Sequence, residues 1–316
     1  MNYLHFIKRS ILLAIAVTLF SACSEQPAPV KLVYPNKVNY ESFIIANHLG
    51  YFKEGDSPVE VITVNTGINA AEALTLGNAD LAAMGDGPTV MLMAQKKNVS
   101  IITRYAKGER IHRMVADTSI HVSANLLGKR IGVQVGSSTY GALMSWLENH
   151  NIPADQITIV PMDPLNMPEA MKNRQLDAIA GSEPWPLNVE KLCQNSVHEL
   201  DNLQNEKNHF PHVLLANNKI FSEKSKKGIL SVLKALDKAN DFISANPDSS
   251  AKIASHYIGL TEKEQKECLS RLTWELDWTS SDLNSLEETA SFFLKSKKIA
   301  ERPDIAKYLH LMSAEK

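Results

Sequence analysis

The stretch EALTLGNADLAAMGDGP, residues 72–88, decides the fold, because a similar stretch, EAMKNRQLDAIAGSEPW, returns 97 residues later at residues 169–185. Both stretches begin with a helical pattern and continue as a short apolar run of strand length. In this register Asp86 falls on Glu183, so a carboxylate follows the end of the predicted strand in both halves. The repeat predicts two lobes of the same α/β construction, and chance similarity between two helix–strand units is the alternative.

Outward from this repeat, strands and helices alternate in both halves, which is typical of α/β lobes with largely parallel sheets. The first half is predicted to hold strands at residues 31–34, 59–64, 79–84 and 99–105, with helices at 41–49, at 69–76 and from Gly87. The second half is predicted to hold strands at 130–135, 156–160 and 176–180, with helices at 138–149 and 166–175. After residue 221 the pattern predicts helices alone, at 229–244, 249–256, 262–272, 281–294 and 303–312.

Composition narrows the class of protein. A chain of 316 residues is long enough for about two domains, and 33 Lys and Arg against 35 Asp and Glu give a net charge of −2. Without a basic excess there is no electrostatic case for nucleic-acid binding. Three cysteines are too few for a disulfide scaffold or an all-cysteine zinc site. Cys193 and Cys268 could form a disulfide, but they are expected in different lobes, where a bridge would hinder relative motion, and free thiols are therefore expected.

Sequence motifs of catalysis are missing. The sequence has neither a phosphate-binding GxxxxGK(S/T) loop nor a GxSxG nucleophile turn, so we predict that the chain is not an enzyme and takes no cofactor. His112, His209 and His212 lack the spacing of metal ligands, and no metal site is predicted.

The N-terminus has the pattern of an export signal. Lys8 and Arg9 precede the apolar run 11–20, which is too short to span a bilayer and is followed by Ser21-Ala22-Cys23. This ending looks like a bacterial lipobox, which predicts a signal peptide over residues 1–22, lipidation of Cys23 and an extended tether over residues 23–30. A plain signal peptide with an incidental cysteine is the alternative.

Several turns at strand ends are candidate ligand sites. The turn Gly136–Ser138 follows a predicted strand and opens a helix, so its backbone N–H groups and hydroxyls suit an oxyanion. Asp86 and Glu183 lie beyond the carboxyl ends of strands, where open α/β sheets bind ligands. We expect these two acids to face one another across a cleft; helix capping and a salt bridge are the respective structural alternatives. Trp185 and Tyr40 are candidate aromatic walls.

The repeated stretches, together with LLGKRIGVQVGSSTYGAL (126–143) and SVLKALDKANDFISANPDSSAKIASHYIGL (231–260), resemble the nitrate/sulfonate/taurine-type substrate-binding proteins of bacterial ABC importers. The resemblance covers nearly the whole chain after the signal. It implies a two-lobe periplasmic-binding-protein fold, α/β in class, with a mixed sheet flanked by helices in each lobe. It also implies that residues 31–115 form the first part of lobe 1, 116–211 form lobe 2, and 212–316 return to lobe 1 as a helical segment.

The resemblance implies two crossings between the lobes, near residues 114–120 and 209–213, and a ligand cleft lined by turns of both lobes. Carried over onto this sequence, the ligand-binding residues are expected to be Asn36, Tyr40, Thr66, Gly67, Asp86, Gly87, Thr89, Gly136, Ser137, Ser138, Asp163, Glu183 and Trp185.

The charges in these turns point to a type of ligand. Lys37 is the one Lys or Arg among them, whereas acids occupy three of the turns, as Asp86, Asp163 and Glu183. A zwitterion of the taurine kind or a neutral heterocycle therefore fits better than a bare anion.

The resemblance implies a monomeric lipoprotein on the periplasmic face of the cell envelope. Its expected partners are a small molecule and an ABC permease, with membrane contact through the lipid alone. Two alternatives remain: an enzyme of the same fold acting on a thiamine-pyrimidine-type metabolite, and a ligand-binding partner of a sensor.

Overall fold

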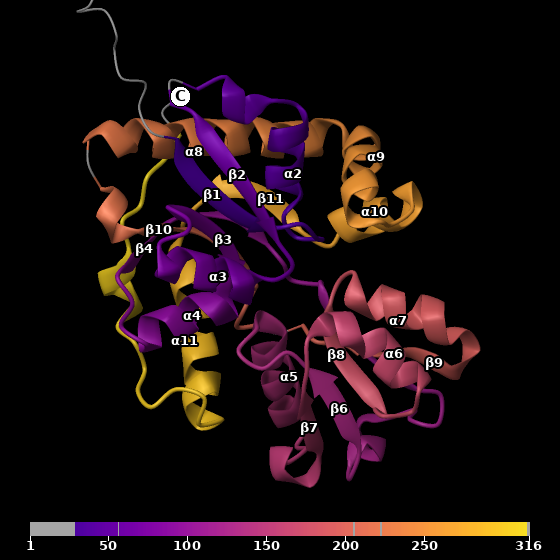
Figure 1. Cartoon of the computed structure of the whole chain (residues 1–316). Helices are drawn as coiled ribbons and strands as arrows, with labels where there is room; N and C mark the ends of the chain where they lie inside the picture. Colours follow the sequence, from indigo (N-terminus) through magenta and orange to yellow (C-terminus); the bar gives the residue numbers. More distant parts are fainter. Residues whose placement is uncertain (1–28, 56, 205, 222, 315–316) are drawn as a thin grey trace, which may run out of the picture.

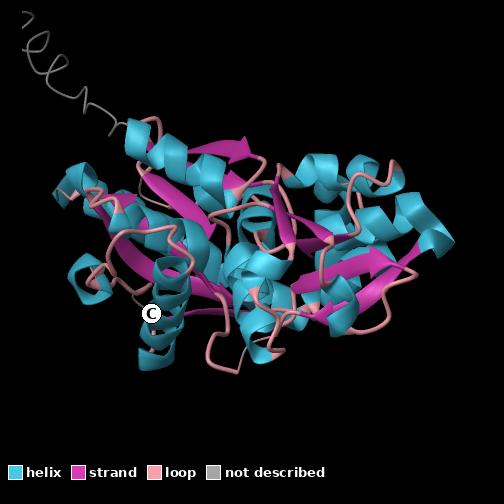
Figure 2. Cartoon of the chain, turned by 90° about the horizontal axis from the view of Figure 1, so that it is seen from below, coloured by secondary structure: helices cyan, strands magenta, loops and turns pink. Residues whose placement is uncertain are grey.

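The computed structural model describes residues 29–55, 57–204, 206–221 and 223–314, which form two lobes side by side (Figure 1). The first lobe is built on a six-stranded sheet with the strand order β11-β4-β10-β3-β1-β2. The second lobe is built on a five-stranded sheet with the order β7-β6-β8-β5-β9. Figure 2, which views the molecule from below, shows helices around both sheets, so the sheets form the buried layers of their lobes.

The first lobe begins with alternating strands and helices. They are β1 (Val30–Pro35), α2 (Glu41–His48), β2 (Val59–Val64), α3 (Gly67–Leu76), β3 (Leu81–Gly85), α4 (Asp86–Ala94) and β4 (Val99–Lys107). Strand β1 pairs in parallel with β2 on one side and β3 on the other, because helical crossovers return the chain to the same end of the sheet before each strand begins. Every residue of β3 is buried, as expected for a strand covered on both faces.

The second lobe repeats this construction with an antiparallel edge. Its elements are β5 (His112–Asp117), β6 (Arg130–Val133), α5 (Ser138–Asn149), β7 (Thr158–Pro161), α6 (Met167–Lys172), β8 (Ala178–Ser182), α7 (Trp185–Cys193) and β9 (Val197–Asn202). Strand β6 pairs in parallel with β7 and β8, whereas β5 runs antiparallel between β8 and β9.

The chain then returns to the first lobe through β10 (Pro211–Asn217), which lies antiparallel between β3 and β4. It continues as α8 (Glu223–Ala245), α9 (Pro247–Ile258), α10 (Glu262–Leu269), β11 (Thr273–Asp277) and α11 (Ser280–Lys295). Helices α8, α9 and α10 lie along one side of the first sheet, and α11 lies near α4 on the other side (Figure 1).

The 97-residue repeat appears in the structure as matching local geometry. The shift maps β3 onto β8 from first residue to last. Asp80 precedes β3 and Asp177 precedes β8, and the two make matching contacts. The Asp80 carboxylate accepts from the backbone N–H of Lys31, and the Asp80 backbone N–H donates to the Lys31 carbonyl. Asp177 makes the same two bonds with the backbone of Arg130. The two halves therefore share a way of fixing one strand to its neighbour.

The structure differs from the sequence prediction at several places. Residues 112–115, expected in lobe 1, begin β5 in the second sheet, so the first crossing between the lobes precedes residue 112 instead of lying near 114–120. Helix α7 and strand β9 were not predicted. Strand β11 occupies residues 273–277, where helices alone were expected. Residues 303–312 hold one short 3-10 turn, Ile305–Tyr308, rather than a helix. Val30, expected in the tether, is a buried residue of β1. β11 is a short edge strand with alternating exposure, so its apolar signal is weak.

The predicted signal peptide and Cys23 lie outside the described residues. Within the part of the chain that the structure describes, no helix is long and apolar enough to cross a membrane. Cys193 and Cys268 are both free.

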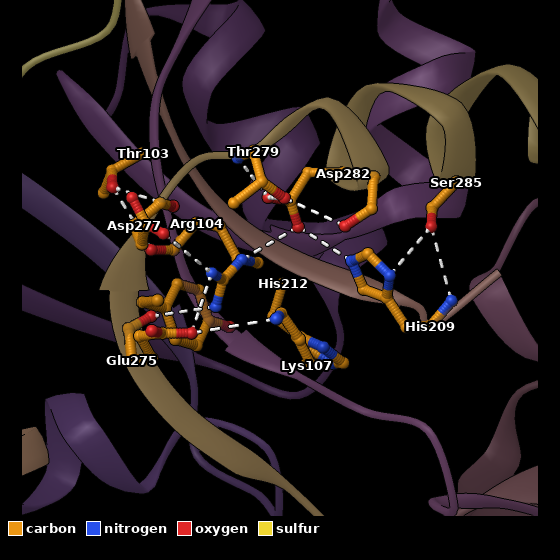
Figure 3. Close-up of polar contacts among 12 residues, drawn as sticks. Thr103, Arg104, Lys107, His209, His212, Glu275, Asp277, Thr279, Asp282 and Ser285 are labelled. Carbon is orange, nitrogen blue, oxygen red and sulfur yellow. Dashed lines mark hydrogen bonds and ion pairs between the residues drawn. The ribbon is translucent and has the colours of Figure 1, made fainter.

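A buried ion pair ties the return segment to the first sheet (Figure 3). Nε of Arg104 on β4 lies 2.8 Å from Oδ1 of Asp282 on α11, and both side chains are fully buried. Asp282 also contacts Nε2 of His209 at 2.7 Å and accepts from the backbone N–H of Thr279 at 2.6 Å. Arg104 donates to the carboxylate of Glu275 on β11. Burial alone would raise the pKa of Asp282, but the bond to His209 and the charge of Arg104 lower it to about 2.

We predict that Asp282→Asn lowers the free energy of unfolding by about 3 kcal/mol, because it leaves the buried Arg104 guanidinium without its closest counter-charge. Urea unfolding at pH 7 measures this loss. The contribution of Asp282 is present above its unfolded pKa, near 4, and is lost as pH falls through its folded pKa of about 2.

The wild type should therefore approach the variant in stability between pH 4 and pH 2. Asp304→Asn is the matched control, because Asp304 pairs with Lys307 at the exposed surface, where such pairs contribute about 0–1 kcal/mol. Equal losses in the two variants would contradict the assignment.

Candidate functional site

A cavity of about 50 Å³ lies between the two lobes. By volume it has room for roughly three or four water-sized groups, which suits a compact small molecule. The described residues that line it are Lys37, Asn39, Tyr40, Thr66, Gly67, Ile68, Gly85, Pro88, His112, Gln134, Ser137, Ser138, Thr139, Pro164, Met167, Ala180, Gly181, Ser182, Trp185 and His212.

The N-terminal ends of five helices meet at this cavity. The lining includes the N-cap residues of four helices, which are Tyr40 for α2, Thr66 for α3, Gly85 for α4 and Ser137 for α5. It also includes Trp185, the first residue of α7. Helix N-termini carry partial positive charge and free N–H groups, so their convergence favours an anionic or acceptor-rich ligand.

Among the described lining residues, Lys37 carries the one side-chain charge at neutral pH, and none is a carboxylate. Its Nζ donates to Oγ of Ser182 at 2.8 Å, which joins the first lobe to the second. Burial lowers the pKa of Lys37 to about 8, while the nearby Glu41 and Glu183 act to raise it. At neutral pH the ammonium is therefore mostly charged, and its side chain is half-buried in the cavity wall.

Two buried histidines in the lining are neutral. Burial holds the pKa of His112 well below its ordinary value and lowers that of His212 to about 3, with the Lys37 charge adding to both effects. His112 Nδ1 lies 2.9 Å from Oγ1 of Thr139, and its Nε2 has no hydrogen-bond partner among the described residues. Nδ1 of His212 lies 3.0 Å from the carbonyl oxygen of Phe210.

The indole of Trp185 supplies a further polar atom to the site. Its Nε1 is buried and lacks a hydrogen-bond partner within the described part of the chain. A buried donor without a partner costs roughly 1–3 kcal/mol, so a ligand acceptor at this position would recover that energy.

The backbones of the two lobes come close together at the starts of α4 and α5. The backbone N–H of Gly87 donates to Oγ of Ser138 at 3.3 Å. A Cβ at Gly87 would lie 2.4 Å from the backbone C of Ser137 and N of Ser138. Only glycine fits here while the two helix starts are in contact.

Six of the expected site residues line the cavity: Tyr40, Thr66, Gly67, Ser137, Ser138 and Trp185. Their roles are partly structural. Oγ of Ser137 donates to the carbonyl of Gln134 at 2.6 Å and accepts from the backbone N–H of Tyr140, so this hydroxyl is occupied by helix capping. Oγ of Ser138 instead accepts from the backbone N–H of Gly87 in the other lobe.

The expectation that Asp86 and Glu183 face one another across the cleft is wrong. Neither residue lines the cavity. Oδ2 of Asp86 accepts from Nδ2 of Asn208 at 3.2 Å and from Oγ1 of Thr289 on α11. Asp86 therefore holds α4 to the return segment of its own lobe.

Glu183 is held inside the second lobe. Its Oε1 accepts from Nε of Arg113 at 2.6 Å, and both side chains are buried. Arg113 also contacts Glu190 on α7 and Glu199 on β9. The salt bridge that was the structural alternative for Glu183 is the observed arrangement.

The other expected residues lie outside the lining. Asn36 donates to the carbonyl of Tyr257 on α9, and Thr89 to that of Gly85. Gly136, with a φ of +84°, serves the turn before α5. Asp163 is an exposed cap that accepts from the backbone N–H of Leu165 at 2.9 Å. Gly87 acts at the contact between the lobes.

Sequence reasoning missed several lining residues, chiefly Asn39, His112, Gln134, Ser182 and His212. Ser182 could have been predicted from the 97-residue repeat, because the repeat aligns it with Gly85, and both residues line the cavity. His112 was missed because β5 was not predicted. Among the described residues no group of three His, Cys, Asp or Glu could hold a metal ion.

Comparison with known proteins gives distant but extensive similarities. A protein of Brucella abortus with the general description of a binding protein is 25% identical over 222 residues, which are 68% of this chain and 66% of that protein, just under two thirds of its length. The taurine-binding periplasmic protein of Escherichia coli is 23% identical over 185 residues, 58% of this chain and 56% of that protein.

Solved structures establish the fold. The alkanesulfonate-binding protein SsuA from Xanthomonas axonopodis pv. citri, bound to MOPS, superposes with a TM-score of 0.81 at 20% identity, covering 92% of this chain and 100% of that one. The periplasmic-binding-protein fold and the resemblance to nitrate/sulfonate/taurine-type binding proteins are thus confirmed. The family model described as NMT1/THI5 like matches residues 37–250. Because this match covers more than half of the chain, the protein belongs to the NMT1/THI5-like family.

Proposed function

We propose that this protein is the substrate-binding component of an ABC importer, and that it captures a small organic sulfonate between its lobes and delivers it to a permease. The observation that carries the proposal is the charge of the cavity lining. Five helix N-termini and the Lys37 ammonium surround the cavity, and none of the described lining residues is an acid.

The similar proteins support the chemical class. One relative is named for taurine and one structural neighbour for alkanesulfonates, and both ligands carry a sulfonate group. A sulfonate offers three acceptor oxygens, which match convergent N–H groups and an ammonium. The expectation that acidic residues select a cationic ligand group loses its basis, because Asp86 and Glu183 are engaged elsewhere.

Capture and release follow from the contacts between the lobes. Lys37 bonds to Ser182, and Gly87 to Ser138, across the cavity. A ligand that contacts both lobes binds the closed form better than the open form and so shifts the population toward it. The closed form is then the state that a permease recognises. This role needs no chemical change in the ligand.

Export and a lipid anchor complete the proposal. The charged start, the apolar run and Ser21-Ala22-Cys23 support an exported protein whose Cys23 is lipidated at the periplasmic face. The anchor keeps the protein near its permease.

The test of the proposed ligand class is titration calorimetry of ethanesulfonate, taurine, nitrate and a thiamine-type aminopyrimidine, in wild type and Lys37→Gln. We predict that Lys37→Gln weakens sulfonate binding by roughly ten- to a hundredfold, because a charge-assisted hydrogen bond contributes about 1.5–3 kcal/mol.

Sulfonate affinity of the wild type should also decline as pH rises above about 8, where Lys37 loses its proton. The variant should show no such decline.

Lys53→Gln, which changes an exposed lysine, is the control. Preferred binding of the aminopyrimidine would overturn the sulfonate assignment and favour a heterocyclic ligand. Mass spectrometry of the ligand after incubation with stoichiometric protein tests the non-catalytic role, since a changed mass would identify an enzyme.

We predict that Gly87→Ala prevents full closure, because its Cβ would lie 2.4 Å from backbone atoms of the opposite lobe. The variant should bind the ligand at least tenfold more weakly, and its radius of gyration in small-angle scattering should stay at the open value when ligand is added. Gly141→Ala on α5 is the matched control, since the added Cβ would meet neighbours at an ordinary 3.8 Å. Ligand-induced compaction of Gly87→Ala equal to that of wild type would refute the closure contact.

We predict that Cys23→Ala moves the protein from the membrane fraction to the soluble periplasmic fraction, because it removes the residue that would carry the lipid. Fractionation and immunoblotting measure this change. Identical partitioning of variant and wild type would show that the protein has a different means of export or retention.

A further inference from the structure

The His212 ring is held in one tautomer by its own backbone neighbourhood. Nδ1 lies 3.0 Å from the carbonyl oxygen of Phe210. A carbonyl oxygen can only accept a hydrogen bond, so Nδ1 must carry the proton. In a neutral ring the other nitrogen, Nε2, then has a lone pair and no proton.

The ring is neutral and lines the cavity. His212 is 3% exposed, and burial together with the Lys37 charge disfavours its protonation. Tyr40 and Tyr105 make T-shaped contacts with the ring, at centroid distances of 6.1 and 6.0 Å. Within the described part of the chain the ring makes its hydrogen bond through Nδ1, which leaves Nε2 as an acceptor at the cavity wall.

This acceptor is fixed, unlike the amide groups beside it. The side chains of Asn39 and Gln134 also line the cavity, but an amide can turn to present either its oxygen or its NH₂ group. The Lys37 ammonium and Trp185 Nε1 can only donate, whereas the Tyr40 hydroxyl and the His112 ring, whose tautomer its bond to Thr139 does not fix, can donate or accept. In the described lining, Nε2 of His212 can therefore only accept a hydrogen bond, so it binds best to a ligand group that donates one.

The charge of that donor is also constrained. No carboxylate belongs to the described lining, and the one ammonium there is Lys37. A second, ligand-borne ammonium would be desolvated beside neutral imidazoles with like charge nearby, which is unfavourable. A neutral hydroxyl, amide or ring N–H meets the same acceptor without that cost.

We propose that His212 is a specificity-determining residue that selects, among small sulfonates, those bearing an uncharged O–H or N–H group for its Nε2. This inference rests on the proposed function, since it refines the ligand of the same cavity. It separates a hydroxysulfonate both from a plain alkanesulfonate and from the zwitterion taurine.

Three probes of nearly equal size test the proposal by titration calorimetry: ethanesulfonate without a donor, 2-hydroxyethanesulfonate with a neutral hydroxyl, and taurine with an ammonium. We predict that 2-hydroxyethanesulfonate binds roughly three- to tenfold more tightly than either of the others, the range expected for one neutral hydrogen bond. His212→Asn keeps an amide N–H near the position of Nδ1 but removes Nε2, so it should abolish this preference while sulfonate binding persists.

His256→Asn, at the exposed surface of α9, is the matched control and should keep the wild-type order of affinities. Nitrogen NMR of the free protein provides a second readout, because a lone pair on Nε2 gives a pyridine-like signal and a protonated Nδ1 a pyrrole-like one. The opposite pattern would overturn the tautomer, and equal affinities for the three probes, or tighter taurine binding, would overturn the selection. Failure of all three sulfonates to bind would instead count against the proposed function.

Discussion

The site depends on the direction of the parallel strands in both sheets, because their carboxyl ends face the region between the lobes. In each lobe the parallel strands run toward the gap between the lobes, and the helices that follow them start there, so their positive ends and free N–H groups meet at one place. This arrangement comes from the backbone and needs few special side chains. It explains why the lining is mostly small or uncharged and still favours an anion, with Lys37 adding a single full charge.

The carboxylates at the ends of the repeated strands have a different use. Asp86 lies at the start of α4 and Glu183 just before α7. Each carboxylate points into its own lobe, where it accepts hydrogen bonds from buried side chains. A carboxylate that also faced the cavity would oppose the helix ends and repel an anionic ligand. Binding Asp86 to Asn208, and Glu183 to Arg113, removes that conflict. The same residue type at equivalent positions therefore stabilises the two lobes separately.

Much of the fold was predictable from sequence, because β2, α5 and the repeated strands have strong local patterns and clear turn residues. The strand–turn–helix pattern located Ser138, and the family resemblance located Tyr40, Thr66 and Trp185, all of which line the cavity. The direction of a side chain at such a turn depends on partners far away in the sequence. Asp86 and Glu183 were misassigned because their partners Asn208, Thr289 and Arg113 have no local signature. His112 and His212 lie on antiparallel strands that bring them to the site only through tertiary pairing.

The second crossing between the lobes is fixed to the first lobe, which locates where closure must occur. Asn208 donates to Asp86 and Thr289, and the next residue, His209, contacts Asp282 and Ser285 of α11. The carbonyl of His209 also accepts from the backbone N–H of Gly108, on the other crossing. Because these bonds hold residues 208–209 against buried groups, they move with the first lobe. If the lobes open by a backbone rotation, these contacts favour a position on the second-lobe side of Asn208. Such a rotation would leave the Phe210 carbonyl, and with it the His212 tautomer, unchanged.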